Sequence, residues 1–144
     1  MNTAIEFVRN ISSAYSRQCR PLCHELNIPQ TALDILLFLA NNPDCRSASD
    51  IVEIRKIKAN LVSVNVEKLV CEGYLKREAV AGDRRKILLV CTEKAVPIIE
   101  KGQKMQTEFF QKLFENVTEQ QKKAFLETMK IIGHNADRIT EDSL

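Results

Sequence analysis

The sequence lacks the features that mark membrane, secreted and highly charged proteins. None of its apolar runs approaches the roughly 18 residues that a membrane span needs. Its first residues do not combine a basic region with an apolar stretch, so we expect no secretory signal and a cytoplasmic location. Neither sign of charge dominates, because 21 basic residues oppose 19 acidic ones and leave a net charge of +2. Any binding of nucleic acid must therefore depend on where the charges lie.

Residues that build metal, disulfide or catalytic sites are also scarce. The chain has only two histidines, and its five cysteines are an odd number, which argues against a disulfide framework. Cys19 and Cys23 lie four residues apart beside His24, a spacing that suits a metal site or a redox pair but equally suits small buried side chains. There is no Ser/His/Asp set, phosphate loop or metal signature, so we expect neither an enzyme nor a cofactor.

Helical periodicity is what the sequence has in abundance. Apolar residues recur every three to four positions over about residues 5–26, where Pro21 is expected to kink or split the helix. Asn27 offers a left-handed stop, and residues 30–40 are apolar nearly all round, which predicts a buried helix. Ser47, followed by Asp50, predicts the cap of a short helix. A longer helix over residues 58–72 is stopped by Gly73.

The period changes from 3.6 to 2 after Gly73. Residues 74–80 and 86–91 are predicted to be two strands, joined by a basic turn over residues 81–85. A helix capped by Thr92 should reach about residue 115, with Pro97 either distorting its first turn or delaying its start. A capping box from Thr118 to Gln121 opens a last helix that ends near residue 139. The predicted fold is mainly α with a small β-hairpin.

Residues 55–57 separate two of these helices, which gives the layout of a helix-turn-helix. A helical wheel places five apolar residues of the second helix on one face: Ala59, Val62, Val66, Leu69 and Val70. The opposite face and its flanks carry Lys58, Asn60, Leu61, Ser63, Val64, Asn65, Glu67 and Lys68. One apolar side for packing and one side of short polar and basic groups is what a DNA recognition helix needs. Glu67 is unfavourable near phosphates unless a base amine or a cation meets it.

The hairpin carries the second candidate contact. Arg84 and Arg85, with Lys86 beside them, form a cationic projection at its tip, and Arg on a narrow loop suits the minor groove of DNA. Asp83 either pairs with a neighbouring Arg or only makes the turn. Arg55, Lys56 and Arg77 are further candidates for phosphate contact.

Three short patterns give the sequence a family likeness. They are Leu69-Val70-Cys71-Glu72-Gly73-Tyr74-Leu75 followed by Arg77, then Gly82-Asp83-Arg84-Arg85, then Val90-Cys91-Thr92-Glu93-Lys94-Ala95. With the order of the helices, they resemble the MarR (multiple antibiotic resistance regulator) family over almost the whole chain. The sequence departs from the family pattern at Asn27 and Ala95, where glycine is usual, and at Val64, where members often carry Arg or another polar residue.

The resemblance implies a winged helix-turn-helix at residues 29–92. It also implies a homodimer formed by residues 1–28 and 93–144 that binds a palindromic operator in double-stranded DNA. The second helix would enter the major groove and the wing the minor groove. In many members a small molecule or a cysteine oxidation releases the DNA. Apolar stripes in the last two helices fit a helix pair and dimer core: Phe109, Phe110, Leu113, Phe114, Phe125, Met129 and Ile132.

Two alternatives stay open at this point. The first is a thiol-based regulator that still binds DNA and senses oxidation through Cys19 and Cys23. The second is a winged-helix module that binds protein and not DNA. Loss of Arg84 and Arg85 would leave the activity of such a module intact.

Overall fold

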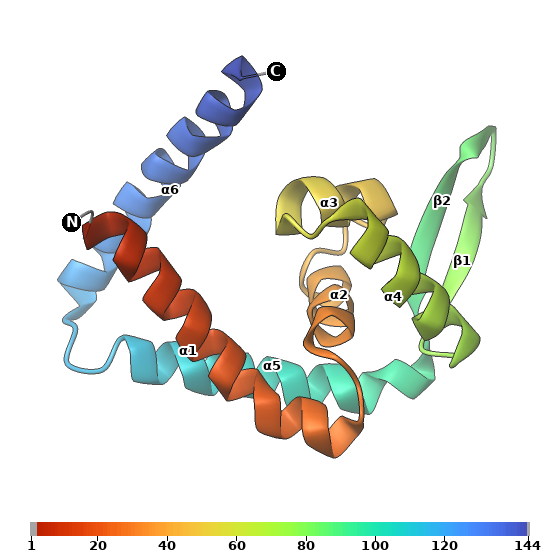
Figure 1. Ribbon diagram of the computed structural model, residues 1–144, viewed down its shortest axis with the longest axis horizontal. Coiled ribbons are helices and arrows are strands. Elements are labelled where there is room, and N and C mark those ends of the chain that lie inside the picture. Colours follow the sequence, from red (N-terminus) through yellow and green to blue (C-terminus); the bar gives the residue numbers. More distant parts are fainter. Residues whose placement is uncertain (1–2, 144) are drawn as a thin grey trace. The chain divides into compact units, whose positions relative to one another are not determined.

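A computed structural model describes residues 3–143 (Figure 1). In chain order the elements are α1 (Thr3–Leu26), α2 (Gln30–Asn41), α3 (Ala48–Arg55), α4 (Ala59–Cys71), β1 (Leu75–Val80), β2 (Asp83–Cys91), a 3-10 turn η1 (Glu93–Ala95), α5 (Val96–Leu113) and α6 (Glu119–Asp142). The chain forms two compact units, one ending at Phe109 and one beginning at Phe110. Within the described residues, no helix has the length and apolar character needed to cross a membrane.

The first helix runs without interruption through Pro21, so the expected split does not occur. Proline removes one backbone donor, and the loss is tolerated here because both Pro21 and Arg17, whose carbonyl loses its partner, lie at exposed positions that water can reach. α1 ends as expected at Asn27, which takes a left-handed backbone with φ of 53°. The amide of Ile28 then donates to the carbonyl of Cys23 at 3.1 Å and closes the helix end.

The core of the first unit is built around α2, as its all-round apolar sequence predicts. Seven of its twelve residues are buried: Ala32, Leu33, Ile35, Leu36, Leu37, Phe38 and Leu39. α1, α3, α4 and β2 all contact it. α5 packs tightly against it at Gly102, where an added Cβ would lie 2.7 Å from Cδ2 of Leu37. The glycine is therefore required by close packing between the two helices.

The helix-turn-helix and hairpin follow directly from local signals. α4 ends in a Schellman motif, in which Gly73 has φ of 82° and the amide of Tyr74 donates to the carbonyl of Leu69 at 2.9 Å. β1 and β2 pair antiparallel, from Leu75 opposite Cys91 to Val80 opposite Asp83. Figure 1 shows α4 between α3 and the hairpin, which extends away from the helices. The mainly α fold with one small hairpin is confirmed.

The start of the fifth helix combines both outcomes expected from Pro97. Thr92 precedes one turn of 3-10 helix, and α5 proper begins at Val96, so Pro97 lies in the first turn where a missing donor costs nothing. The Thr92 hydroxyl does not cap this helix. It donates instead to the carbonyl of Gly73 at 2.5 Å, which ties the end of the hairpin to its beginning.

The second unit consists of the end of α5, a turn and α6. Asn116 turns the chain with φ of 60°, and Thr118 caps α6 in the expected capping box with Gln121. The rings of Phe114 and Phe125 meet edge to face, 5.9 Å apart. α6 runs to Asp142 and buries none of its residues in the described chain. The apolar stripe of α6, which includes Met129, Ile132 and Ile139, is therefore exposed in the described chain.

Candidate nucleic-acid interface

The turn between α3 and α4 is defined by its caps. Ser47 Oγ accepts from the Asp50 amide at 3.1 Å, and Asp50 Oδ2 accepts from the Ser47 amide at 3.0 Å. These hydrogen bonds hold the pKa of Asp50 below its usual value. α3 ends at Arg55, Lys56 takes a left-handed backbone with φ of 59°, and Lys58 is the N-cap of α4. The short turn predicted from the sequence is therefore present.

An ion pair between a largely buried carboxylate and an exposed arginine joins α3 to α2. Arg55 Nη2 lies 3.1 Å from Oδ2 of Asp34, whose side chain is only 11% exposed. Burial raises the pKa of Asp34, and the charge of Arg55 opposes that rise. Arg55 is thus engaged within the protein, although the sequence made it a candidate for phosphate contact. A single carboxylate in an otherwise apolar helix was the signal for this pair, because a buried charge needs a partner.

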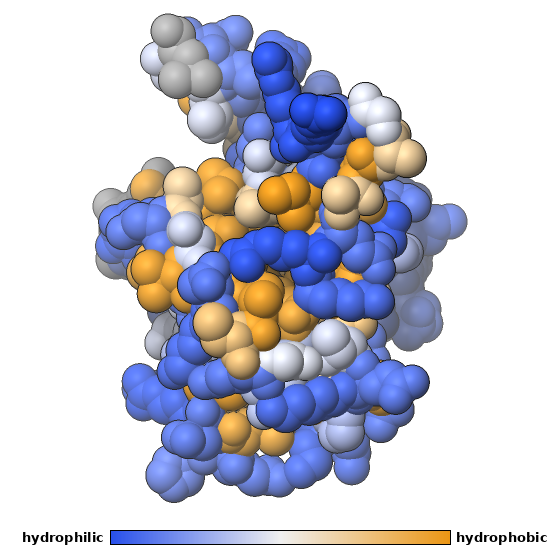
Figure 2. Space-filling model, turned by 90° about the vertical axis from the view of Figure 1, so that its right-hand side faces the viewer, coloured by the Kyte–Doolittle hydropathy of each residue, from blue (hydrophilic) through white to orange (hydrophobic). Residues whose placement is uncertain are grey.

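The outer face of α4 is the exposed strip that carries Asn60, Leu61, Ser63, Val64, Glu67 and Lys68. All six are exposed, as the helical wheel predicts. Val64 is 66% exposed and Leu61 is 43% exposed, although both are large and apolar. On the hairpin side of the molecule, apolar patches alternate with strongly hydrophilic residues (Figure 2).

Two residues of α4 differ from the helical-wheel prediction. Ala59 is exposed and not part of the packing face, because it lies in the first turn, at the rim of a groove. Asn65 is only 9% exposed, and its Nδ2 donates to the carbonyl of Leu61 at 2.8 Å. This hydrogen bond lets a polar side chain sit among Val62, Val66 and Leu69. Of the two asparagines in α4, only Asn60 faces outward.

Glu67 is neutralised by a cation from the hairpin. Arg77 of β1 places Nη2 2.7 Å from Oε2 of Glu67, and its charge and hydrogen bond lower the pKa of that carboxyl. From the sequence alone, Arg77 was a candidate for phosphate contact, and Glu67 was unfavourable near phosphates. Both residues are exposed, so together they offer an ion pair on the surface rather than an isolated negative charge.

The cations of the hairpin lie in an irregular stretch of β2. Val80 pairs with Asp83 and Ala79 pairs with Ile87, so residues 84–86 have no opposite residue in β1. The turn itself is only Ala81 and Gly82, shorter than predicted, because Gly82 adopts φ of 85° and lets β2 begin at Asp83. Arg84, Arg85 and Lys86 therefore belong to the strand next to the tip, and all three are exposed.

Asp83 shapes this stretch through the backbone. Its Oδ1 accepts from the Arg85 amide at 3.0 Å, which favours the turn-making role over an ion pair. In the part of the chain that the structure describes, neither Arg84 nor Arg85 has an ion-pair partner. Their charges are available to a ligand.

The base of the hairpin is fixed to the helices. Leu75 and Leu89 are buried in the core, and the Leu89 amide donates to the carbonyl of Arg46 at 2.7 Å. Lys94 lies over the ring of Tyr74, 4.5 Å from its centroid, and donates to the carbonyl of Glu72. The base of the hairpin is thus attached by packing and hydrogen bonds, whereas Arg84, Arg85 and Lys86 near its tip are exposed.

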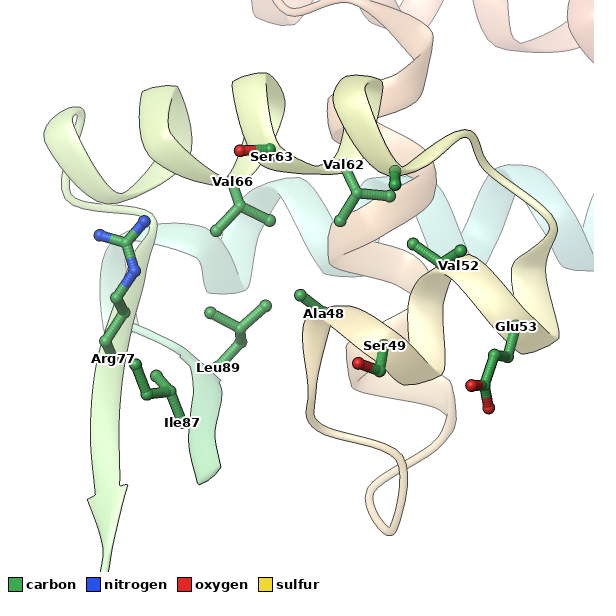
Figure 3. Close-up of a pocket in the computed structure, with 11 residues that line it drawn as sticks. Ala48, Ser49, Val52, Glu53, Val62, Ser63, Val66, Arg77, Ile87 and Leu89 are labelled. Atoms are coloured by element: carbon green, nitrogen blue, oxygen red, sulfur yellow. The ribbon is translucent and has the colours of Figure 1, made fainter. Parts of the chain in front are cut away.

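A groove of about 440 Å³ separates α3, α4 and the hairpin (Figure 3). Val62 and Val66 point into it from α4, Leu89 from β2 and Val52 from α3. The guanidinium of Arg77 reaches from β1 toward α4 at one end of the groove. This volume is within the range of small-molecule pockets.

The two cysteines that the sequence offers as a possible redox pair are buried or partly buried. Cys19 is completely buried, and burial raises the pKa of its thiol to about 11. Burial also raises the pKa of Cys23. Cys71 is the exposed thiol, and Cys45 is partly covered. Among the described residues, no group of three or more His, Cys, Asp or Glu side chains is placed to hold a metal.

Comparison with known proteins shows what this region is similar to. Residues 26–86 match a family model described as MarR family. Over this stretch the chain is similar to MarR-family proteins. No curated protein sequence matches the chain. The match covers α2, the helix-turn-helix and most of the hairpin, which are the elements that carry the outer face of α4 and the basic strand.

Solved structures with MarR-type folds align with almost the whole chain. A transcriptional regulator with 20% identity superposes with a TM-score of 0.84, covering 94% of this chain and 98% of its own. A MarR transcriptional regulator from Methanosarcina mazei Go1 has 23% identity, a TM-score of 0.72 and coverages of 94% and 95%. A MarR family regulator from Listeria monocytogenes, solved with a 26mer DNA, has 16% identity, a TM-score of 0.82 and coverages of 94% and 89%. The winged-helix fold is thereby confirmed.

Proposed function

We propose that this protein is a transcription regulator that binds specific sequences in double-stranded DNA. The observation that carries the proposal is the pairing of two exposed features, the outer face of α4 and the unpaired arginines of β2. The MarR-family match of residues 26–86 supports it, as does the similar Listeria regulator, which was solved with DNA. Binding, not catalysis, is the proposed activity. The expected cytoplasmic location rests on this proposal.

Each feature suits a different groove of DNA. α4 enters the major groove, with Asn60, Leu61, Ser63 and Val64 toward the bases and Lys58 and Lys68 toward phosphates. The basic strand enters or borders the minor groove, where Arg84, Arg85 and Lys86 meet the negative potential and Asp83 fixes the backbone. Arg77 acts indirectly, by masking the charge of Glu67.

The protein acts as a homodimer in this proposal. α6 carries Met129, Ile132 and Ile139 at helical spacing. In the single chain their side chains are 49%, 61% and 68% exposed. Ile5 and Val8 of α1 add further exposed apolar surface. Patches of this kind on a soluble protein mark an interaction surface. A two-fold dimer would present two α4 helices roughly 34 Å apart, which fits a palindromic operator.

Repression and release complete the proposal. A dimer bound across a promoter blocks polymerase, and an effector that changes the separation of the two α4 helices lowers DNA affinity through a coupling of about 1–3 kcal/mol. Release by a small molecule is favoured over release by oxidation. The groove under α4 has room for a small ligand, whereas burial disfavours the thiolate forms of Cys19 and Cys23.

Selection of bound duplexes from a random pool tests this function. Purified protein at low salt should enrich a palindrome whose half-sites lie about one turn of DNA apart. The same selection with the Arg84→Ala, Arg85→Ala double variant should enrich it weakly or not at all. If the wild-type protein enriches no duplex, the proposed function is wrong, and a protein partner becomes the better explanation of the winged helix.

A further inference from the structure

Two large apolar side chains stand out on the outer face of α4. Val64 is 66% exposed and Leu61 is 43% exposed, and they lie three residues apart, so they share one side of the helix. Neither contributes to the core of the described chain, which α4 reaches through Val62, Val66 and Leu69. Valine is also a poorer helix former than alanine. The fold therefore gives no reason for an apolar residue at position 64.

The polar groups around these two residues are equally distinctive. Residues 59–67 contain no Lys or Arg, so the basic groups of α4 stand only at its ends, in Lys58 and Lys68. Glu67 forms an ion pair with Arg77, and the side-chain amide of Asn65 donates a hydrogen bond to the Leu61 carbonyl. The groups that remain for recognition at the middle of the helix are the Asn60 amide, the Ser63 hydroxyl and the two apolar side chains.

This set of groups matches one base pair better than the others. Guanine is usually read by Arg or Lys, which donate to its O6 and N7, and neither is present at the centre of the face. An apolar side chain matches the 5-methyl group of thymine, which only an A·T pair displays in the major groove. Asparagine matches N6 and N7 of adenine.

We propose that Val64 and Leu61 determine operator specificity by packing against thymine methyl groups at the centre of each half-site, with Asn60 on an adjacent adenine. The inference rests on the proposed function and names the bases that α4 reads. Positions 61 and 64 are about 4.5 Å apart along the helix axis, close to the rise between neighbouring base pairs of about 3.4 Å. The two side chains would therefore contact neighbouring base pairs.

Replacing thymine by deoxyuridine removes only the methyl group and so tests the inference directly. In the selected duplex, this change at the central thymines should weaken wild-type binding about fourfold for each buried methyl. With Val64→Ala the same change at its thymine should have almost no effect, because the contact is already gone. Alanine favours the helix, so this variant should fold normally. Val96→Ala, which trims an exposed valine of α5, is the matched control and should keep full sensitivity to deoxyuridine.

The possible results separate this inference from the proposed function. If the selected half-sites have G·C pairs at their centre, or if Val64→Ala and Leu61→Ala retain the wild-type sensitivity to deoxyuridine, the methyl readout is wrong. DNA binding as such would then still stand. If no duplex is selected at all, the proposed function fails first, and the inference fails with it.

Discussion

The carboxylate of Glu67 on α4 and the guanidinium of Arg77 on β1 form an ion pair at 2.7 Å. The pair joins the proposed recognition helix to the wing, the two elements that would contact different grooves of DNA. It also removes the one unfavourable negative charge from the middle of the outer face of α4. The pair should therefore matter more for DNA binding than for folding, since solvent screens exposed ion pairs and they add little to stability.

Replacing Arg77 by alanine should weaken DNA binding several-fold and leave the free energy of unfolding almost unchanged. The reason is that Glu67 then faces the phosphates with its charge exposed. Fluorescence anisotropy with a labelled duplex and chemical denaturation measure the two effects. The double variant Arg77→Ala, Glu67→Gln should recover much of the lost affinity. Equal weakening in the single and double variants would mean that Arg77 contacts DNA itself.

Replacing Ser47 by alanine should destabilise the protein by about 1 kcal/mol. The change removes the hydroxyl that accepts from the Asp50 amide and leaves the start of α3 without its cap. Ser49→Ala is the control, because Ser49 is exposed inside the same helix, where alanine is favourable. Urea denaturation of both variants checks the expectation, and a loss of the same size in the control would show that capping is not the cause.

Gly102→Ala should lower stability by about 1–3 kcal/mol, because the new methyl group would lie 2.7 Å from Cδ2 and 3.0 Å from Cδ1 of Leu37. A double-mutant cycle isolates this clash. In a Leu37→Ala background, already weakened by its own cavity, the added methyl should cost clearly less than in the wild type. An identical cost in both backgrounds would place the effect elsewhere in α5.

The thiols should differ sharply in reactivity toward a disulfide reagent near neutral pH. Cys71 is exposed and should react first, whereas Cys19 is buried with its pKa raised to about 11. The thiolate of Cys19 becomes abundant only as the pH approaches that value, so its reaction should be slow until the protein unfolds. Cys71→Ser should abolish the fast phase. A fast phase that survives in Cys71→Ser and disappears in Cys19→Ser would revive the oxidation-sensing alternative.

Local signals in the sequence were enough to predict most of the fold. Ser47 with Asp50, Thr118 with Gln121, and the stops at Asn27 and Gly73 each act within a few residues, and all are found as expected. Of the two outcomes expected at Pro21, a kink or a split, the split does not occur, because an exposed proline can be accommodated by solvent without ending a helix.

The candidate site was less predictable, because its decisive contacts join separate elements. Neither the Glu67–Arg77 pair nor the Asp34–Arg55 pair follows from spacing within one helix or strand, so the sequence did not indicate that these two possible phosphate contacts have carboxylate partners within the protein. The irregular pairing that leaves residues 84–86 without partners depends on Gly82 shortening the turn. By contrast, the exposure of Asn60 and Val64 followed from the helical wheel alone.

The most direct test of the central claim is the salt dependence of DNA binding. The dissociation constant of the wild-type protein and of the Arg84→Ala, Arg85→Ala variant should be measured on the selected duplex over a range of salt concentrations. The account predicts a steep fall of wild-type affinity with salt and a slope reduced by about two in the variant, one for each lost phosphate contact. Equal slopes in the two proteins, or affinity that salt does not change, would contradict a single DNA-binding surface formed by α4 and the wing.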